Sequence, residues 1–435
     1  MKEVDATDRR VGELVQADPC ALFYRLAQEL PGEQVVINFG REKLLVCQDC
    51  NSAQTILRDR PDNFNKNFGA FVSFFGISRL TTDGALWRKL QKIGQPLISR
   101  VESTEVARQT SLYYGQAAAQ LLDAAQKSPV VTVDGFIDHA AASVVMKTVF
   151  GLDISGLPAR FYDDLRIVLT YCGKVSWNIQ DTPFAVDIKM RAEAERAMGE
   201  VRTTMMELIA AGRSGNTGDN PLLNSFYTAF PSDADLFGEF CTLFFAGFDT
   251  TSSTLCWALM LLAHQPALQD RLRHEVRQLP EGQDDTNVAA PTKSMSAFIN
   301  ETFRMFPAIP ILSRVAVGED LVGGTRVQAG QKILLSLIGL HHDSTFWPVP
   351  SKMDIGRFPD GDPSGEMRKH LLPFSAGPRT CGGSKLAVTE IAMALATLLR
   401  YLRFEPAEQQ PVRFQWGASM RHKGGIRLVV AAHVD

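Results

Sequence analysis

The chain has 435 residues, of which 45% are hydrophobic and 21% are charged, and its formal net charge at pH 7 is -3. This mixture is typical of a globular protein with a sizeable buried core and argues against extensive disorder. Nucleic-acid-binding proteins usually carry a clear basic excess, so the charge balance argues against that class. Seven irregularly spaced cysteines in so long a chain do not resemble the dense framework of a small secreted domain.

Nothing in the sequence predicts a membrane protein. The N-terminal residues contain no apolar run of the kind that forms a signal peptide or a membrane anchor. No stretch elsewhere reaches the ~18 uninterrupted apolar residues that a membrane span needs. We therefore expect a soluble, cytoplasmic protein without a membrane anchor.

The first predicted elements are strands, and long helices follow them. Residues 34–38 and 43–47 are β-rich and flank a turn at residues 40–42, which predicts a hairpin. Residues 103–127 and 190–211 contain good helix formers and few breakers, so we expect two long helices there.

After a predicted surface loop at residues 212–221, the sequence predicts one very long helix. Residues 232–265 begin with Ser/Asp capping candidates, contain no proline and stop directly before Pro266. A helix of this length would be ~50 Å long and would cross most of a domain. Because the segment is apolar nearly all round, we expect it to be central and buried.

Strand patterns return at residues 311–317 and 332–337, which are joined through a glycine-rich connection. The chain shows no internal repeat, low-complexity tract or convincing interdomain linker. The pattern therefore predicts one domain over residues 1–435, mainly α with a smaller β region.

A cysteine loop comes next, at residues 374–383, with three glycines, one arginine and one cysteine before a helix that starts near Ser384. Glycines allow the backbone to turn tightly and to approach a flat partner closely. Neighbouring backbone amides and the dipole of the following helix favour a thiolate at Cys381. Such a cysteine is a good soft ligand for iron, although a lone cysteine in a glycine-rich turn is more often structural.

The cysteine loop resembles the haem-binding signature of the cytochrome P-450 family, Phe-x-x-Gly-x-Arg/His-x-Cys-x-Gly. Every fixed position agrees, at Phe374, Gly377, Arg379, Cys381 and Gly383. The resemblance implies that Cys381 is the axial ligand of haem b, that Phe374 shields its sulfur and that Arg379 pairs with a haem propionate. It also implies the cytochrome P-450 fold, with haem between the long central helix and the helix after the cysteine loop.

The central helix contains an insertion of small and polar residues around Ala246, Gly247, Asp249 and Thr250. A buried carboxylate and hydroxyl cost free energy unless they find partners or chemistry requires them. Ala246 and Gly247 would let a planar cofactor lie against the backbone, and Thr250 could bond a carbonyl one turn back. A kinked helix with a satisfied polar pair is the alternative. The family resemblance implies that Asp249 and Thr250 deliver protons for dioxygen activation.

A charged pair follows in an apolar helical segment. Glu301 and Arg304 lie three residues apart, so their side chains can touch on one helical face. In isolation such a pair is usually solvated at the surface. The resemblance implies a buried Glu-x-x-Arg pair that is joined by Arg357 from a Gly-Arg-Phe segment and that holds the haem-binding core.

Further cofactor contacts follow from the same resemblance. Arg314 matches a family position that reaches a propionate, and arginine suits bidentate pairing. Trp87 and Gln91 resemble the Trp-x-x-x-Arg helix of the family, but Gln91 stands where arginine is usual. A glutamine still donates a hydrogen bond, so both remain cofactor-binding candidates. The missing charge would come from Lys92 or Arg88.

The resemblance places the aromatic-rich loop at residues 67–80, the central helix, the segment after Pro307 and a turn near the C-terminus around the substrate pocket. The candidate substrate-binding residues are Phe71, Phe75, Ala246, Ile309, Ile311 and Met420. All are apolar, which favours a hydrophobic substrate such as a terpenoid, a polyketide or a fatty acyl chain, in natural-product metabolism. No charged residue stands out to anchor a carboxylate.

The family resemblance therefore predicts a haem-thiolate monooxygenase that uses dioxygen and two electrons to hydroxylate or epoxidise a hydrophobic small molecule. Nothing resembles a flavin or nicotinamide site, so electrons from NAD(P)H would arrive through a separate ferredoxin or flavodoxin with its reductase. Its docking surface, on the thiolate side of the haem, would include basic residues, although a solvated basic face is an equally good interpretation. These residues are Arg88, Lys89, Lys92 and Lys385.

Several alternatives stay open. The same haem site could catalyse peroxide-driven oxygenation, desaturation or oxidative coupling, although the presence of Asp249 and Thr250 favours dioxygen. A noncatalytic haem sensor or electron carrier could use the same cysteine, but a sensor would need an output domain, and none is visible. In an interaction protein without haem, the cysteine loop would be incidental.

Overall fold

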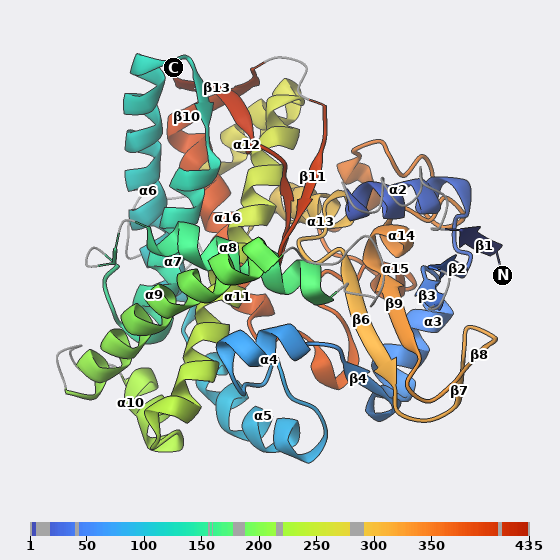
Figure 1. The fold of residues 1–435 in the computed structure, drawn as a ribbon. Helices are drawn as coiled ribbons and strands as arrows, with labels where there is room; N and C mark the ends of the chain where they lie inside the picture. Colours follow the sequence, from blue (N-terminus) through green and yellow to red (C-terminus); the bar gives the residue numbers. More distant parts are fainter. Residues whose placement is uncertain are drawn as a thin grey trace.

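The computed structural model describes residues 2–5, 18–39, 43–154, 157–158, 160–176, 188–214, 221–278, 291–407 and 411–433. Within these residues the chain is mainly α-helical with smaller sheets, as the sequence predicts (Figure 1). The helices are α2 Pro19–Glu29, α3 Cys50–Gln54, α4 Gly69–Phe75, α5 Gly84–Ser99, α6 Ser103–Lys127, α7 Asp134–Phe150, α8 Phe161–Ser176, α9 Ile188–Arg213, α10 Pro221–Ala229, α11 Asp233–Ala263, α12 Pro266–Arg277, α13 Lys293–Met305, α14 Leu337–His341, α15 Met367–His370 and α16 Ser384–Tyr401.

Most of the β structure lies in a six-stranded sheet with the order β1-β2-β3-β9-β6-β4. Smaller sheets are formed by β10-β13-β5, by β11-β12 and by β7-β8. The strands are β1 Lys2–Asp5, β2 Val35–Asn38, β3 Lys43–Cys47, β4 Phe64–Lys66, β5 Val130–Thr132, β6 Ile311–Ala316, β7 Asp320–Val322, β8 Thr325–Val327, β9 Lys332–Ser336, β10 Leu402–Pro406, β11 Phe414–Trp416, β12 Met420–His422 and β13 Arg427–Ala432.

The hairpin and the long helices agree with the sequence predictions. Strands β2 and β3 pair antiparallel, with Val35 opposite Val46. Helix α6 has the predicted bounds, and α9 extends two residues further at each end. The hairpin turn at residues 40–42 and residues 215–220 of the predicted surface loop lie outside the described residues.

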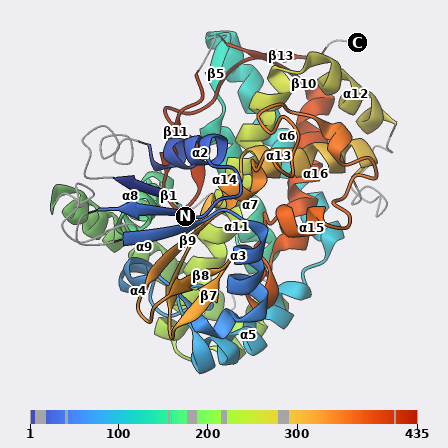
Figure 2. The ribbon, with the colours of Figure 1, turned by 90° about the vertical axis from the view of Figure 1, so that its right-hand side faces the viewer.

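The central helix α11 is apolar on nearly every side and is buried along most of its length, as predicted. It starts after Ser232 and ends just before α12, whose first residue is Pro266, because proline is tolerated in the first turn of a helix but not in its interior. Helix α11 contacts α7, α9, α13 and α16. In Figure 2 the six-stranded sheet lies in front of this helical core.

One prediction of local structure is wrong. The aromatic-rich segment expected to be a loop contains the short helix α4, which ends at Gly76 with a φ of 78°. Helical spacing brings Phe71 and Phe75 to one face, where both pack against Phe245 of α11. Burial of this aromatic face stabilises a helix that local turn signals do not predict.

Among the described residues, no helix is long and apolar enough to span a membrane.

Candidate active site

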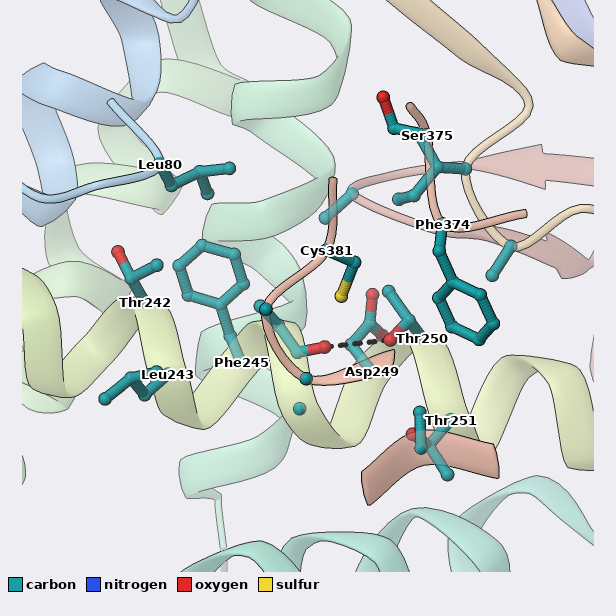
Figure 3. Close-up of a pocket in the computed structure, with 18 of the residues that line it drawn as sticks. Leu80, Thr242, Leu243, Phe245, Asp249, Thr250, Thr251, Phe374, Ser375 and Cys381 are labelled. Atoms are coloured by element: carbon teal, nitrogen blue, oxygen red, sulfur yellow. Dashed lines mark hydrogen bonds between the residues drawn. The ribbon is translucent and has the colours of Figure 1, made fainter. Parts of the chain in front are cut away.

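A cavity of about 450 Å³ lies between α11 and the cysteine loop, residues 374–383 (Figure 3). Its lining is predominantly apolar, which is typical of a site for a hydrophobic ligand. Most of the predicted cofactor, catalytic and substrate residues line it: Phe71, Trp87, Gln91, Ala246, Gly247, Asp249, Thr250, Ile309, Ile311, Arg314, Phe374, Arg379, Cys381 and Gly383. The fold thus brings together segments that are far apart in the sequence.

The cysteine loop folds tightly around its own backbone. The Cys381 amide donates to the Phe374 carbonyl at 2.9 Å, and the Thr380 amide donates to the Gly377 carbonyl at 3.1 Å. Gly377 does not line the cavity; it has a φ of 69°, and a Cβ there would meet the Leu57 carbonyl oxygen at 1.9 Å. Glycine is therefore required at 377 to pack the loop against its neighbour.

The Cys381 side chain is exposed, but the exposed surface faces the cavity and protein atoms surround the rest (Figure 3). Burial raises the pKa of the Cys381 thiol, and a hydrogen bond with the Gly383 backbone opposes this effect only in part. Burial therefore opposes the thiolate, whereas the Gly383 backbone bond and the dipole of α16 favour it. A metal cation bound at the sulfur would supply the missing stabilisation.

The ring of Phe374 packs edge-on against Phe303 of α13, with 5.2 Å between ring centroids. This contact fixes Phe374 in the cavity wall beside the cysteine loop.

Across the cavity, α11 presents its small and polar residues. Ala246 is exposed toward the cavity, and the Thr250 hydroxyl donates to the Ala246 carbonyl at 2.8 Å, one turn back, as predicted (Figure 3). At Gly247 a Cβ would meet a methyl group of Val145 on α7 at 2.9 Å. Glycine at this position allows α7 and α11 to pack closely, and Gly247 also lines the cavity.

Asp249 forms an ion pair that the sequence analysis did not anticipate. Arg421 of β12 donates to Asp249 Oδ1 from Nη2 at 2.7 Å and from Nε at 3.1 Å. Nothing in the local sequence around Arg421 signals this contact, because the partners are 172 residues apart. The buried carboxylate is thus paired with a cation rather than with Thr250.

Three cations gather on another wall of the cavity, where Lys66, Arg314 and Arg379 lie near the carboxylate of Asp83. Arg379 donates to Asp83 Oδ1 at 2.6 Å and lies 3.7 Å from the centroid of the Trp87 ring. Arg314 is buried and donates to its neighbouring carbonyl, at Ser313, at 2.8 Å. In the protein alone, Arg379 therefore has a protein partner where the sequence predicts a propionate.

Lys66 is the residue of this group that sequence reasoning missed. Its ammonium donates to the carbonyls of Leu80 at 2.8 Å and of Arg79 at 3.1 Å. Burial, together with the nearby Arg379 and Arg314, lowers the pKa of Lys66 to about 7. Burial likewise lowers the pKa of Arg314 to about 10. No local sequence pattern indicates this role of Lys66, because Lys66 meets Arg314 only through the register of β4 with β6.

Gln91 lines the cavity. The positive charge that an arginine would bring at this position does not come from Lys92 or Arg88 of the same helix, contrary to the prediction. Arg88 pairs with Asp62 at 2.8 Å on the surface, and Lys92 is exposed and outside the cavity lining. Lys66 supplies a cation instead. The amide of Gln91 meets Gln95 at 3.5 Å, and Gln95 donates to the Gly382 carbonyl at 3.2 Å, which connects α5 to the cysteine loop.

Two predicted substrate residues lie behind the cavity wall rather than in it. Phe75 is completely buried against Phe245, and Met420 is completely buried beside α11. The turn near the C-terminus does reach the cavity, through Trp416, Gly417 and Ala418. In a β-hairpin, the alternation of faces and the tip geometry decide which residue points inward, and sequence alone did not fix that register.

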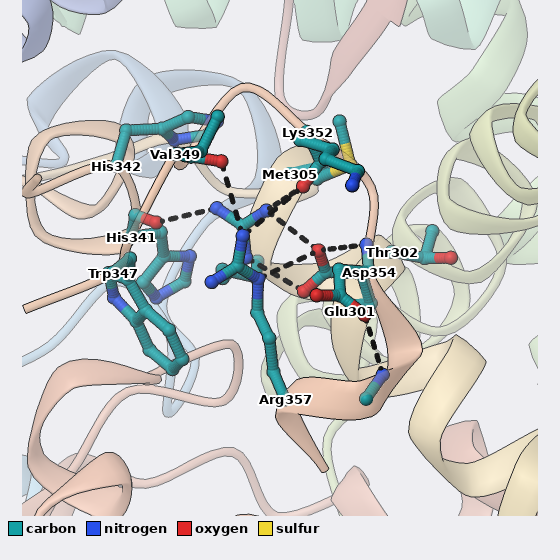
Figure 4. Close-up of polar contacts among 12 residues, drawn as sticks. Glu301, Thr302, Met305, His341, His342, Trp347, Val349, Lys352, Asp354 and Arg357 are labelled. Carbon is teal, nitrogen blue, oxygen red and sulfur yellow. Dashed lines mark hydrogen bonds and ion pairs between the residues drawn. The ribbon is translucent and has the colours of Figure 1, made fainter.

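Glu301, Arg304 and Arg357 meet in one buried network (Figure 4). Arg304 donates to both carboxylate oxygens of Glu301, at 2.7 and 2.8 Å, and to the His341 carbonyl at 3.1 Å. Arg357 Nε and the Asp354 amide donate to Glu301 Oε1 at 3.3 and 2.9 Å. The geometry is the one that a scaffolding role requires: it joins α13 to the segments around residues 341 and 354.

Three features of the described residues fit a bound haem. A thiol faces the cavity, an exposed alanine stands on the opposite helix, and three cations share the wall near Asp83, while the nearby Glu239 and Asp62 are already paired with Arg79 and Arg88. The excess positive charge suits the two propionates of haem, because guanidinium and ammonium groups pair strongly with carboxylates. The described residues include no cluster of three His, Cys, Asp or Glu side chains that would hold a metal ion directly.

Comparisons with known proteins agree with this site. A family model described as Cytochrome P450 matches residues 10–430. Human Cytochrome P450 4F12 is 36% identical over 205 residues, which cover 46% of this chain and 39% of that protein. The cytokinin hydroxylase of Arabidopsis thaliana is 25% identical over 374 residues, 82% of this chain and 72% of that protein.

The crystal structure of the cytochrome P450DA heme domain superposes with a TM-score of 0.82 at 19% identity. The superposition covers 97% of this chain and 95% of that one. This likeness shows the same fold, mainly α with a smaller β region.

Proposed function

The chain belongs to the cytochrome P450 family, and on this premise we propose that it is a haem-thiolate monooxygenase acting on a hydrophobic small molecule. Its reaction would be hydroxylation or epoxidation with dioxygen and two electrons. The observation that carries the proposal is the largely apolar cavity into which Cys381 and the Ala246–Thr250 segment both face. We treat residues 1–435 as one catalytic domain.

In this proposal Cys381 would hold the iron of haem b, and Lys66, Arg314 and Arg379 would hold the propionates. Bound haem would supply the binding and reductive activation of dioxygen. Phe374 and its partner Phe303 would keep water away from the sulfur. The apolar lining would exclude water from the substrate and orient it by shape rather than by charge.

Thr250 and Asp249 would move protons on the α11 side of the cavity. The Thr250 hydroxyl bonds the Ala246 carbonyl at 2.8 Å, so it can rotate to pass a proton into the cavity while remaining on a fixed helix. Asp249 is adjacent in sequence and also lines the cavity, which makes it a candidate carboxylate for replacing that proton.

Replacing Thr250 with alanine should uncouple electron use from product formation. Loss of a positioned acid typically costs a hundredfold or more, so we expect product per NAD(P)H to fall roughly tenfold or more. Thr250→Ser should retain most of the coupling. The control is Thr397→Ala on α16, which removes the same kind of hydroxyl-to-carbonyl bond, at 2.8 Å, away from the cavity. Unchanged coupling in Thr250→Ala would remove the proton role.

Replacing Lys66 with methionine should weaken haem retention. Loss of one charge-assisted hydrogen bond is worth about 1.5–3 kcal/mol, so haem transfer to apomyoglobin should be roughly tenfold or more faster. Because the pKa of Lys66 is lowered to about 7 before haem binds, its charge is present below pH 7 and must be regained by proton uptake above it. The difference between the two proteins should therefore be larger at pH 6 than at pH 8.

The control for Lys66 is Lys92→Met, which removes an exposed ammonium on α5 outside the cavity lining. Haem transfer from this variant should match that of the parent protein at both pH values. Equal transfer rates for Lys66→Met and the parent at pH 6 would show that Lys66 does not hold a propionate.

For the substrate we propose a chemical class, and for the electron donor a type of protein. The largely apolar lining favours a terpenoid, a polyketide or a fatty acyl chain, in line with hydroxylation by the similar cytokinin hydroxylase. Electrons from NAD(P)H would arrive through a ferredoxin or flavodoxin. Lys89, Lys92 and Lys385 are exposed and available to an acidic donor, whereas Arg88 is already paired with Asp62.

A further inference from the structure

Arg421 bridges two carboxylates at the edge of the cavity. Besides its bonds to Asp249, its Nη1 donates to Asp138 Oδ1 of α7 at 2.9 Å, and its Nη2 donates to the Ser252 hydroxyl at 2.7 Å. The side chains of Arg421, Asp249 and Asp138 are 13%, 5% and 3% exposed. Water therefore screens these charges weakly, and each charge depends on its partner.

The network is closed by one further cation. Arg166 of α8 pairs with Asp138, so two guanidinium groups balance two carboxylates. Asp134 and Cys256 also lie close enough to affect Arg421 electrostatically. Burial raises the pKa of Glu390, which lines the same cavity from α16, well above the usual value.

Arg421 is fixed beside the part of the chain that reaches the substrate cavity. The Met420 carbonyl accepts from Ser253 at 2.7 Å and from Trp257 at 2.9 Å, both on α11. The tip of the same β11-β12 hairpin, at residues 416–418, lines the cavity. One residue separates this tip from Met420, whose carbonyl anchors the neighbouring Arg421 to α11. A ligand that moves the tip would therefore act on the position of Arg421.

The contacts of Arg421 determine how the Asp249 carboxylate is oriented. Both side-chain bonds from Arg421 go to Oδ1, and Nη2 also bonds the Asp249 backbone carbonyl at 3.1 Å. This arrangement turns Oδ1 of Asp249 toward β12. Without Arg421, nothing among these contacts would define how the Asp249 carboxylate is oriented.

We propose that Arg421 is the positioning residue of the proton route: it holds the Asp249 carboxylate oriented beside Thr250, and it couples Asp249 to the cavity-lining hairpin. This inference rests on the proposed function, in which Asp249 supplies protons. Arg421 acts through Asp249 and does not itself contact the reacting atoms. Its loss would leave two buried carboxylates facing each other with only Arg166 nearby. Burial and repulsion would then favour protonation of one of them near neutral pH.

The test compares the haem-loaded full chain and its variants with NADPH, a ferredoxin and its reductase, with dodecan-1-ol as an uncharged, largely apolar probe. The readout is the share of NADPH electrons recovered as hydrogen peroxide between pH 6 and pH 8.5, which rises when proton delivery fails, whether or not the probe is oxidised. We expect the parent to be nearly flat with pH. Arg421→Gln should exceed it at pH 6, because the Asp249 carboxylate is no longer oriented, and should exceed it further, several-fold, at pH 8, where both carboxylates are charged and repel.

Three further variants show whether the rise in the peroxide share comes from the action of Arg421 on Asp249. The double variant Arg421→Gln/Asp249→Asn should have the same peroxide share as Asp249→Asn. It should also lose the pH dependence, because Arg421 acts only through Asp249. Arg421→Lys keeps the charge but reaches fewer partners, so its peroxide share at pH 8 should rise about twofold. Arg403→Gln is the matched control: Arg403 also bridges two carboxylates, Asp270 and Glu405, at 3.2 Å each, but on the surface, and its removal should change nothing.

The possible outcomes separate the two proposals. If Asp249→Asn leaves the peroxide share unchanged, the proton role in the proposed function fails. If Asp249→Asn raises it but Arg421→Gln stays like the parent at all pH values, the inference about Arg421 is wrong. An equal loss at every pH with a lower melting temperature would show a merely structural role and would also overturn it. Should Arg421→Gln not bind haem, Arg421→Lys decides, and parent-like values at pH 6 and pH 8 contradict the inference.

Discussion

Cys381→Ser is expected to abolish the thiolate-type Soret shift of the reduced protein with carbon monoxide, together with all oxygenase activity. The sulfur is the only thiol in the cysteine loop, and its exposed surface faces the cavity. Serine has nearly the same shape and preserves the backbone bond from residue 381 to the Phe374 carbonyl at 2.9 Å. Its hydroxyl is a hard and far less acidic ligand, so the change removes the chemistry of the ligand but keeps the fold.

The measurement is a difference spectrum on purified protein, with haem content determined separately. Cys50→Ser is the control, because Cys50 is also partly exposed but lies at the start of α3, away from the cavity. We expect a parent-like spectrum from this control. A thiolate-type spectrum that persists in Cys381→Ser would show that the iron is held elsewhere and would remove the central claim about this site.

Local patterns made much of this site predictable. The cysteine loop is specified by residues within ten positions, and α11 by an apolar periodicity that ends at Pro266. Both signals are contained in short stretches of chain, where the physical constraint and the residues that meet it are neighbours. The candidate cofactor and catalytic residues could therefore be named before their three-dimensional arrangement was known.

Non-local contacts were the part that sequence could not supply. Lys66 reaches the cavity through the pairing of β4 with β6, and Arg421 reaches Asp249 through a hairpin 172 residues further along the chain. Strand register and hairpin placement depend on the packing of the whole fold, so no local pattern indicates them. The same reason explains why Phe75 and Met420 were assigned to the substrate pocket, although both are buried behind its wall.

The cations around the cavity change how the site is understood. The sequence analysis expected Arg314 and Arg379 to meet propionates and sought the missing charge on α5. The structure instead places Lys66 beside both arginines and gives Arg379 a protein carboxylate, Asp83, at 2.6 Å. Glu239 and Asp62 are neutralised by Arg79 and Arg88, which leaves Asp83 to balance Lys66, Arg314 and Arg379, so this wall keeps a net positive charge until an anionic group binds. Haem binding and the charge state of Lys66 are therefore linked.

Glu301→Gln is expected to produce the largest loss of stability of any single change considered for this protein. The glutamine side chain keeps the size but removes the charge that faces Arg304, and both side chains are fully buried. Breaking a buried ion pair on one side costs about 3–5 kcal/mol, because the remaining charge is left without compensation. At ~2 °C per kcal/mol for a large domain, thermal loss of the haem-thiolate spectrum should shift down by roughly 6–10 °C.

Two variants separate charge from shape in this network. Glu29→Gln removes one partner of the exposed pair with Arg25, at 2.7 Å on α2, and should leave the midpoint unchanged because water solvates the freed charge. The double variant Glu301→Met/Arg304→Met should recover part of the stability lost in Glu301→Gln, since apolar side chains of similar volume remove both buried charges together. Incomplete recovery is expected because Arg357 still points at position 301, with its Nε 3.3 Å from Oε1 of Glu301 in the parent protein. A midpoint for Glu301→Gln within about 1 °C of the parent would contradict the scaffolding role, since a buried unpaired guanidinium cannot be accommodated at so small a cost.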